Sequence, residues 1–227
     1  MVNYDDLPLF PLHVVLFPDM PLPLHVFEPR YREMILRCRE EKSPFGIILI
    51  QAGGESGAEA VPHRIGTTAR IAQFEELPDG RMNILVFGET RFRVTRTRHD
   101  HPYLAAHVEP IYEEASDLER LSTPFEAASG LFRTYLKSLF ALSGRSLSTL
   151  QLPQDPESLS FAIASVLQVP HGEKQSLLEM TDTEQRLDRE SAILRGEIEA
   201  QESLHGVVGG YAAPVDTQAL SRLASLN

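Results

Sequence analysis

The sequence of 227 residues has one cysteine, no tryptophan and no phosphate-binding loop. Its single cysteine, Cys38, excludes an internal disulfide bond and any zinc site made of cysteines alone. No segment reads Gly-x-x-x-x-Gly-Lys-Ser/Thr, so the common phosphate cradle of an ATPase is absent. The Gly-x-Ser-x-Gly elbow, a nucleophile motif of many hydrolases, is absent too. These absences predict a protein that is not an enzyme and that has no catalytic residues and no cofactor.

Positive charge is also scarce, with 21 Lys and Arg against 32 Asp and Glu and a net charge of −11. Nucleic-acid affinity comes mainly from clustered Lys and Arg, so the charge disfavours a nucleic-acid partner. No apolar run reaches the ~18 residues of a membrane helix without a proline or a charge. The N-terminus has no Lys or Arg before Arg30, unlike a secretory signal. We therefore expect a cytoplasmic protein that binds no membrane.

Proline is abundant near the N-terminus, where residues 7–31 include Pro8, Pro11, Pro18, Pro21, Pro23 and Pro29. Proline lacks an N–H and fixes φ, so no uninterrupted helix or central strand is expected there. Short strands joined by bends fit the apolar residues between the prolines. Pro29 suits the first position of a helix, and apolar residues at helical spacing extend that predicted helix to residue 41.

The following residues, up to about 112, have mainly strand signals. Strands are predicted over 45–50, 65–74, 81–87, 91–97 and 103–110, with a mobile loop over 51–63. The turn sequence 77–80 predicts a β-hairpin, because its proline presets φ and its glycine accepts positive φ. Gly88-Glu89-Thr90 is expected to turn the chain again.

Helical signals dominate after Tyr112. A capping-box pattern at 123–126 predicts a helix beginning at Pro124, and Asp155 with Pro156 predicts a second helix. Thr181 with Glu184 is expected to cap a longer helix. The predicted domains are therefore a β-rich domain over 1–112, a helical bundle over 113–205, and a linker with a short helix over 206–227.

Several segments occur in an order that resembles a known family. They are residues 7–31, 45–50, 65–71, 77–81, 88–94, 173–179 and 184–187. In this order they resemble the N-terminal domain of Lon protease, the substrate-binding module of that ATP-dependent protease. The resemblance covers about residues 7 to 200. One departure is Asp19, where the family often has glycine, but aspartate also tolerates turn geometry.

The resemblance implies an α+β fold, in which an N-terminal PUA-like six-stranded β pseudo-barrel with one helix precedes a C-terminal α-helical bundle. It also implies a non-enzymatic module that binds unfolded polypeptide or protein partners and is linked to protein quality control. The ATPase and Ser/Lys protease domains of the family's enzyme are missing from the sequence. A separate ATP-dependent protease is therefore left open as a partner.

Two groups of residues are candidate binding sites. Apolar side chains near the first bends suit extended polypeptide through edge pairing and shallow pockets, and these are Phe17, Met20, Leu22 and Leu24. Met20 is the one expected to be exposed, whereas core packing is the simpler expectation for Phe17 and Leu24. The alternative site is Arg91 with Arg93, which strand alternation places on one face. That pair would serve RNA or an anionic small molecule, unless it is only a solvated strand face.

His99, Asp100 and His101, with His107 nearby, form the best metal-like cluster. Histidines at i and i+2 share a face on a strand, and a carboxylate orients a ligating ring in many metal sites. Asp100 and Pro102 indicate a turn instead, and the spacing lacks a zinc signature. We therefore expect solvated turn histidines and no metal.

Overall fold

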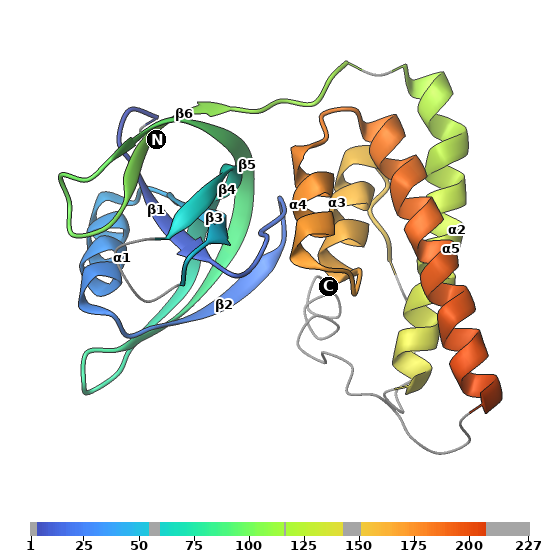
Figure 1. Ribbon diagram of the computed structural model, residues 1–227, viewed down its shortest axis with the longest axis horizontal. Coiled ribbons are helices and arrows are strands. Elements are labelled where there is room, and N and C mark those ends of the chain that lie inside the picture. Colours follow the sequence, from blue (N-terminus) through green and yellow to red (C-terminus); the bar gives the residue numbers. More distant parts are fainter. Residues whose placement is uncertain (1–3, 55–59, 116, 143–150, 208–227) are drawn as a thin grey trace. The chain divides into compact units, whose positions relative to one another are not determined.

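The computed structural model describes residues 4–54, 60–115, 117–142 and 151–207. These residues divide into two compact units (Figure 1). The first, here called the β unit, comprises Met1–Tyr112 with Val169–Glu179, and the second, the helical unit, comprises Glu113–Gln168 with Met180–Asn227. The chain is thus an α+β protein that crosses between its two units three times.

The β unit contains a six-stranded sheet in the order β2-β5-β4-β3-β1-β6, in which β6 also pairs with β5. The sheet therefore closes on itself through five strands, and β2 pairs with β5 outside that ring. Among the strand pairs of the described residues, β1–β3 alone is parallel. The strands are β1 (Leu7–Leu12), β2 (Pro21–Val26), β3 (Phe45–Ala52), β4 (Val61–Glu76), β5 (Met82–Arg98) and β6 (Ala105–Pro110).

Helix α1 (Pro29–Glu41) has the bounds predicted from the sequence. Its apolar stripe, which includes Met34 and Ile35, is buried in a core cluster with residues of β1, β2, β3 and β5. Cys38 belongs to the same stripe, and burial raises the pKa of its thiol to about 11. The thiolate is therefore scarce near neutral pH, and Cys38 acts as a small apolar side chain.

Strand β5 is continuous through Gly88, where the sequence predicted a turn, so that prediction is wrong. The first half of β5 pairs with β2 and the second half pairs with β6. On its other edge β5 pairs with β4 in both halves, and this pairing contains two register shifts. Gly88 instead allows the bend at residues 17–20 to lie close to the backbone of β5. Its carbonyl accepts from the N–H of Asp19 at 2.9 Å, and its own N–H donates to the carbonyl of Met20 at 3.1 Å. Asp19 has a φ of 59°, the left-handed turn geometry that aspartate tolerates.

The predicted loop at 51–63 is shorter than expected, because β3 extends to Ala52 and β4 begins at Val61. Residues 55–59 of that loop lie outside the described residues.

Helix α4 (His171–Glu179) belongs to the β unit, although the sequence boundaries placed these residues in the helical bundle. Two buried side chains attach it to the strands. Arg91 of β5 donates to the carbonyl of Leu178 at 2.7 Å, and Gln175 donates to the carbonyl of Ile65 at 3.1 Å. Periodicity along the chain could not reveal this assignment, because both hydrogen bonds join residues more than eighty positions apart in the sequence.

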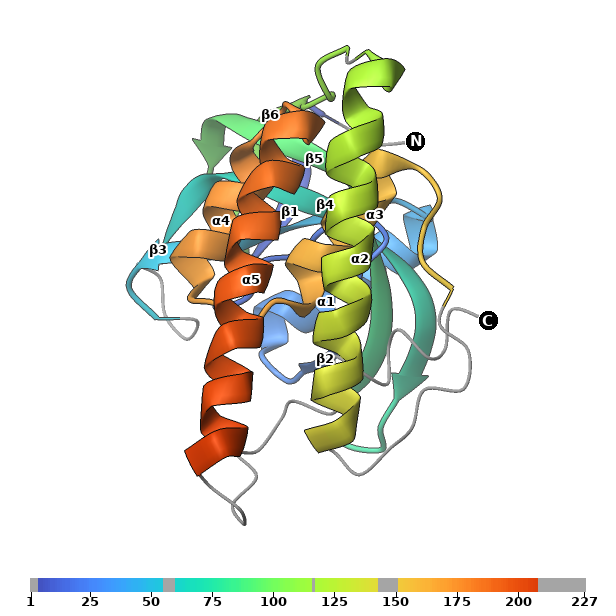
Figure 2. The same ribbon diagram turned by 90° about the vertical axis from the view of Figure 1, so that its right-hand side faces the viewer.

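The helical unit contains α2 (Leu118–Leu142), α3 (Pro156–Val166) and α5 (Thr183–Val207). Figure 2 shows α2 and α5 side by side, and the two helices contact each other extensively. Helix α3 is capped as predicted, since the Asp155 side chain accepts from the N–H of Ser158 at 2.8 Å. The predicted linker begins inside α5, and residues 208–227 lie outside the described residues.

Two predicted helix starts are wrong. Helix α2 begins at Leu118, where the Asp117 carboxylate accepts from the N–H of Glu119 at 3.0 Å, so Pro124 is internal. Helix α5 is capped by Asp182, which accepts from the N–H groups of the two residues after Thr183 at 2.9 and 3.2 Å. In both cases an aspartate nearby in the sequence supplies the cap that the pattern assigned to a threonine.

A polar network is buried in the helical unit around Arg186, which has no exposed surface. Its guanidinium contacts the Glu113 carboxylate at 3.1 Å and the Ser160 hydroxyl at 2.6 Å, and it lies 4.2 Å from the Phe161 ring. The Ser160 hydroxyl also lies 2.8 Å from Glu190, another residue with no exposed surface. Burial raises the pKa of Glu190 well above its usual range, and the bond to Ser160 and the charge of Arg186 only partly oppose this shift.

Glu190→Gln is expected to flatten the pH dependence of stability. Between about 4.5, the ordinary pKa of a glutamate, and its raised folded pKa, Glu190 keeps its proton when folded and loses it when unfolded. The free energy of unfolding of the wild type therefore falls as pH rises through that window and levels off above it. Glutamine removes this titration and makes the variant the more stable protein at high pH. Urea unfolding at several pH values measures both proteins, and equal slopes in this window would contradict the assignment.

Candidate peptide-binding surface

Two of the four apolar residues proposed from the sequence lie in the core of the β unit. Phe17 is 0% exposed and Leu22 is 6% exposed, so neither is available to a ligand while the β unit is folded. Leu24 is half-buried and packs against the core. Met20, predicted to be exposed, is also half-buried. Its N–H donates to the carbonyl of Phe17, and this turn holds the Met20 side chain against the same core. Only Met20 and Leu24 therefore retain accessible surface.

An exposed aromatic residue lies where β2 ends. Residues of β2 alternate between the core, which receives Leu22 and Val26, and the surface, where Pro23 and His25 are exposed. Phe27 continues the outward series and is 56% exposed. The period-two pattern of the sequence contained this signal, although Phe27 was not among the predicted site residues.

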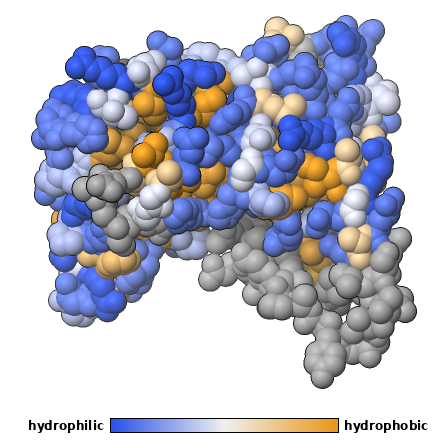
Figure 3. Space-filling model, viewed as in Figure 1, coloured by the Kyte–Doolittle hydropathy of each residue, from blue (hydrophilic) through white to orange (hydrophobic). Residues whose placement is uncertain are grey.

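Phe27 borders a depression of about 270 Å³ between the end of β1 and strand β2. Its apolar lining includes Val14, Pro23 and Leu24, and the Phe27 ring lies 6.2 Å from the ring of His25. Glu28, the one carboxylate in the lining, forms an ion pair of 2.9 Å with Arg30. Figure 3 shows apolar side chains between polar ones on the face of the β unit that it presents. The depression is suited to an apolar side chain of a partner.

The two arginines of the alternative site have different surroundings. Arg93 is exposed, whereas Arg91 is 3% exposed and hydrogen-bonded to α4. Strand alternation places both side chains on the face opposite Phe92, which is buried in the core of the β unit. Helix α4 covers Arg91, so a shared accessible anion site does not form. Helix α4 lies more than seventy residues later in the chain, so no local sequence pattern could have indicated that Arg91 is covered.

Residues of the histidine cluster contact the N-terminal segment. Asp100 pairs with Arg98, and the His101 ring stacks on Tyr103 with Nε2 lying 3.3 Å from the Asp6 carboxylate. His107 lies 3.6 Å from the Asp5 carboxylate. Across the described part of the chain, no group of three or more His, Cys, Asp or Glu side chains is arranged to hold a metal ion. These residues instead link the start of the chain to β5 and β6.

No helix in the described ranges has the length and apolar character needed to cross a membrane.

The closed sheet with helices α1 and α4 forms one unit of the described chain, and α2, α3 and α5 belong to the other. The sequence profile of the ATP-dependent protease La (LON) substrate-binding domain matches residues 6–196. The chain therefore belongs to this family.

Individual relatives agree with this assignment. The chain is 29% identical to a Lon protease of Azospirillum brasilense over 84% of its own length, and 30% identical to one of Xanthomonas oryzae over 87%. It covers only 24% of each of these relatives. Among solved structures, a Lon N-terminal domain protein from Xanthomonas campestris is 30% identical, with a TM-score of 0.59 and coverage of 81% of this chain and 95% of that one. The N-terminal domain of a Mycobacterium avium complex Lon protease shares the fold, with a TM-score of 0.61 at 18% identity over 84% of this chain and 98% of that one.

Proposed function

We propose that this chain is a non-enzymatic module that binds unfolded polypeptide through apolar surface on the β unit. Membership of a substrate-binding family supports the proposal, and the observation that carries it is the exposed Phe27 beside an apolar depression. An exposed aromatic ring next to a shallow apolar hollow is a common anchor for a partner side chain. Unfolded chains offer such side chains, whereas native proteins bury most of theirs.

We place the module in cytoplasmic protein quality control, with a separate ATP-dependent protease as a partner that receives the bound polypeptide. We also infer that the β unit is a PUA-like pseudo-barrel and that 113–205, apart from α4, forms a helical bundle. The closed ring of five strands and the contacts among α2, α3 and α5 support these two inferences.

Replacing Phe27 by serine is expected to weaken binding of a permanently unfolded, fluorescently labelled protein about fivefold. Burial of a large apolar side chain contributes about 1.5–3 kcal/mol, and the Phe27 ring, of which part is already covered in the free protein, contributes roughly 1 kcal/mol of that. Fluorescence anisotropy titrations measure the dissociation constants. Tyr112→Ser is the matched control, because Tyr112 is an aromatic residue of the β unit that is 73% exposed and lies outside the depression.

The control variant should bind within about twofold of the wild type, and circular dichroism confirms that both variants are folded. An equal loss of affinity in the two variants, or no loss of affinity with Phe27→Ser, would show that the depression is not the binding site. The anionic-ligand alternative would then be favoured only if Arg93→Ala proved the sensitive variant.

A further inference from the structure

The second half of β4 has one edge without a strand partner. Strand β3 pairs with β4 only as far as the Phe45–Ala69 pair. Beyond this pair, residues 70–76 of β4 continue alongside β5 and pair with it as far as Glu76 and Met82. Within the described ranges, no strand pairs with the opposite edge of 70–76. Backbone N–H and C=O groups along such an edge can pair with an added strand.

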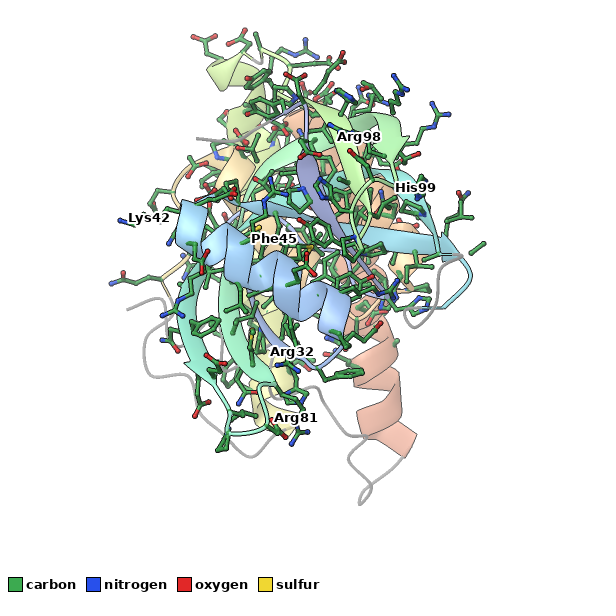
Figure 4. All side chains as sticks on the ribbon, turned by 90° about the vertical axis from the view of Figure 1, so that its left-hand side faces the viewer. Arg32, Lys42, Phe45, Arg81, Arg98 and His99 are labelled. Atoms are coloured by element: carbon green, nitrogen blue, oxygen red, sulfur yellow. The ribbon has the colours of Figure 1, made fainter. Side chains whose placement is uncertain are left out.

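A groove of about 530 Å³ lies beside this edge. One wall is β4 from Arg70 to Phe74, and the other is the end of α1 with the connection at 42–44. Figure 4 shows Lys42 at the end of α1 and Phe45 further in at the start of β3. The connection reverses direction at Lys42, whose φ is 50°, and β3 then pairs with the first half of β4. The end of α1 thus stands beside the free edge without pairing with it.

The groove has an apolar floor and a basic rim. Ile71 and Phe74 are half-buried and pack on the core, and the Arg39 guanidinium lies 4.0 Å over the Phe74 ring. The charged residues of the lining are Arg39, Lys42, Arg70 and Glu89. Arg70 and Glu89 neutralise each other in an ion pair of 2.9 Å. Arg39 and Lys42 therefore leave an excess of positive charge on a chain whose net charge is −11.

The free edge of β2 is less suited to an added strand. Strand β2 pairs with β5 alone, and it contains Pro21 and Pro23. Each proline removes one backbone donor, a common protection of edge strands against further pairing. Residues 70–76 of β4 contain no proline, and Ala72 and Gln73 are exposed.

We propose that an extended segment of a client polypeptide pairs with residues 70–76 of β4 as an additional strand, with an acidic side chain near Lys42 and Arg39. This inference rests on the proposed function, since it specifies how polypeptide binds and which segments are preferred. Apolar residues of the segment cover Ile71 and Phe74, and the carboxylate faces the basic end of the groove. Glu75 and Glu76 are exposed beyond Phe74, so the carboxylate of the segment is favoured at the Lys42 end of the edge.

Three synthetic peptides test the mode of binding. The first alternates valine and threonine and has two aspartates at one end, the second has lysines in place of the aspartates, and the third is the acidic peptide with alternate backbone nitrogens methylated. The acidic peptide should bind at least fivefold more tightly than the lysine peptide at low salt. Methylation on the pairing edge should weaken binding at least tenfold, because it removes the backbone donors of the added strand.

Lys42→Glu is expected to weaken binding of the acidic peptide about five- to tenfold and to improve binding of the lysine peptide. Lys137→Glu is the matched control, since Lys137 is an exposed lysine of α2 in the helical unit, and it should change neither. Hydrogen exchange provides an independent readout, with slower exchange expected for the amides of 70–76 when the acidic peptide is bound.

The outcomes separate this inference from the proposed function. If the unfolded protein binds but the peptides show no dependence on charge, methylation or Lys42, polypeptide binding stands and the added strand is wrong. Exchange protection that is confined to regions outside 70–76 would also overturn it. If neither the unfolded protein nor the acidic peptide binds, both proposals are wrong.

Discussion

Arg186→Met is expected to lower the free energy of unfolding of the helical unit by about 3 kcal/mol or more, as is typical when one partner of a buried ion pair is removed. The guanidinium is the centre of the network, since it contacts Glu113, Ser160, Thr183 and the carbonyl of Met180. Methionine fills much of the volume but donates no hydrogen bond. It removes the guanidinium that pairs with the largely buried Glu113 carboxylate.

Urea unfolding followed by circular dichroism at a helix-sensitive wavelength measures this effect. Arg186→Lys is the control, because it keeps the charge but lacks the planar fork that reaches several partners at once. The free energy of unfolding of Arg186→Lys should lie between those of the wild type and of Arg186→Met. A loss below about 1 kcal/mol for Arg186→Met would show that the network contributes no more than an exposed ion pair.

Gly88→Ala is expected to destabilise the β unit by about 3 kcal/mol, the upper part of the range for overpacking. A Cβ atom on Gly88 would overlap the carbonyl oxygen of Phe17 and would lie 3.2 Å from Leu16. The first contact is with backbone, so the bend at 17–20 must move away from β5. That movement breaks the two hydrogen bonds that join Asp19 and Met20 to Gly88.

Gly130→Ala in α2 is the matched control, because beyond its chain neighbours and the backbone of its own helix no atom lies within 4 Å of the Cβ that it adds. It should leave stability unchanged or raise it by up to about 1 kcal/mol, since alanine has the higher helix propensity. Thermal unfolding of both variants gives the comparison. Equal behaviour of the two variants would contradict the close approach of the bend to β5.

Local signals in the sequence were sufficient for some elements. Pro29 and the apolar spacing after it predicted α1 with its observed bounds, and Asp155 predicted the start of α3. These elements depend on residues close together in the sequence. Phe27 could also have been found, because the alternation of β2 continues to it.

Other features depend on distant residues and could not be predicted locally. Gly88 looked like a turn residue, but the bend at Phe17 decides its role. Arg91 looked accessible, but α4 covers it, and α4 itself packs with strands that precede it by about a hundred residues. The tertiary contacts therefore changed the candidate sites more than they changed the element types.

Binding of the wild-type protein to an unfolded chain, compared with the same chain in its native fold, tests the central claim most directly. The account predicts binding of the unfolded form alone and only a modest change in affinity between about 50 and 500 mM salt, because apolar contacts contribute most of it. An affinity that falls steeply with salt would indicate an anionic ligand site instead. Equal affinity for the two forms, or no binding of the unfolded form, would contradict the account.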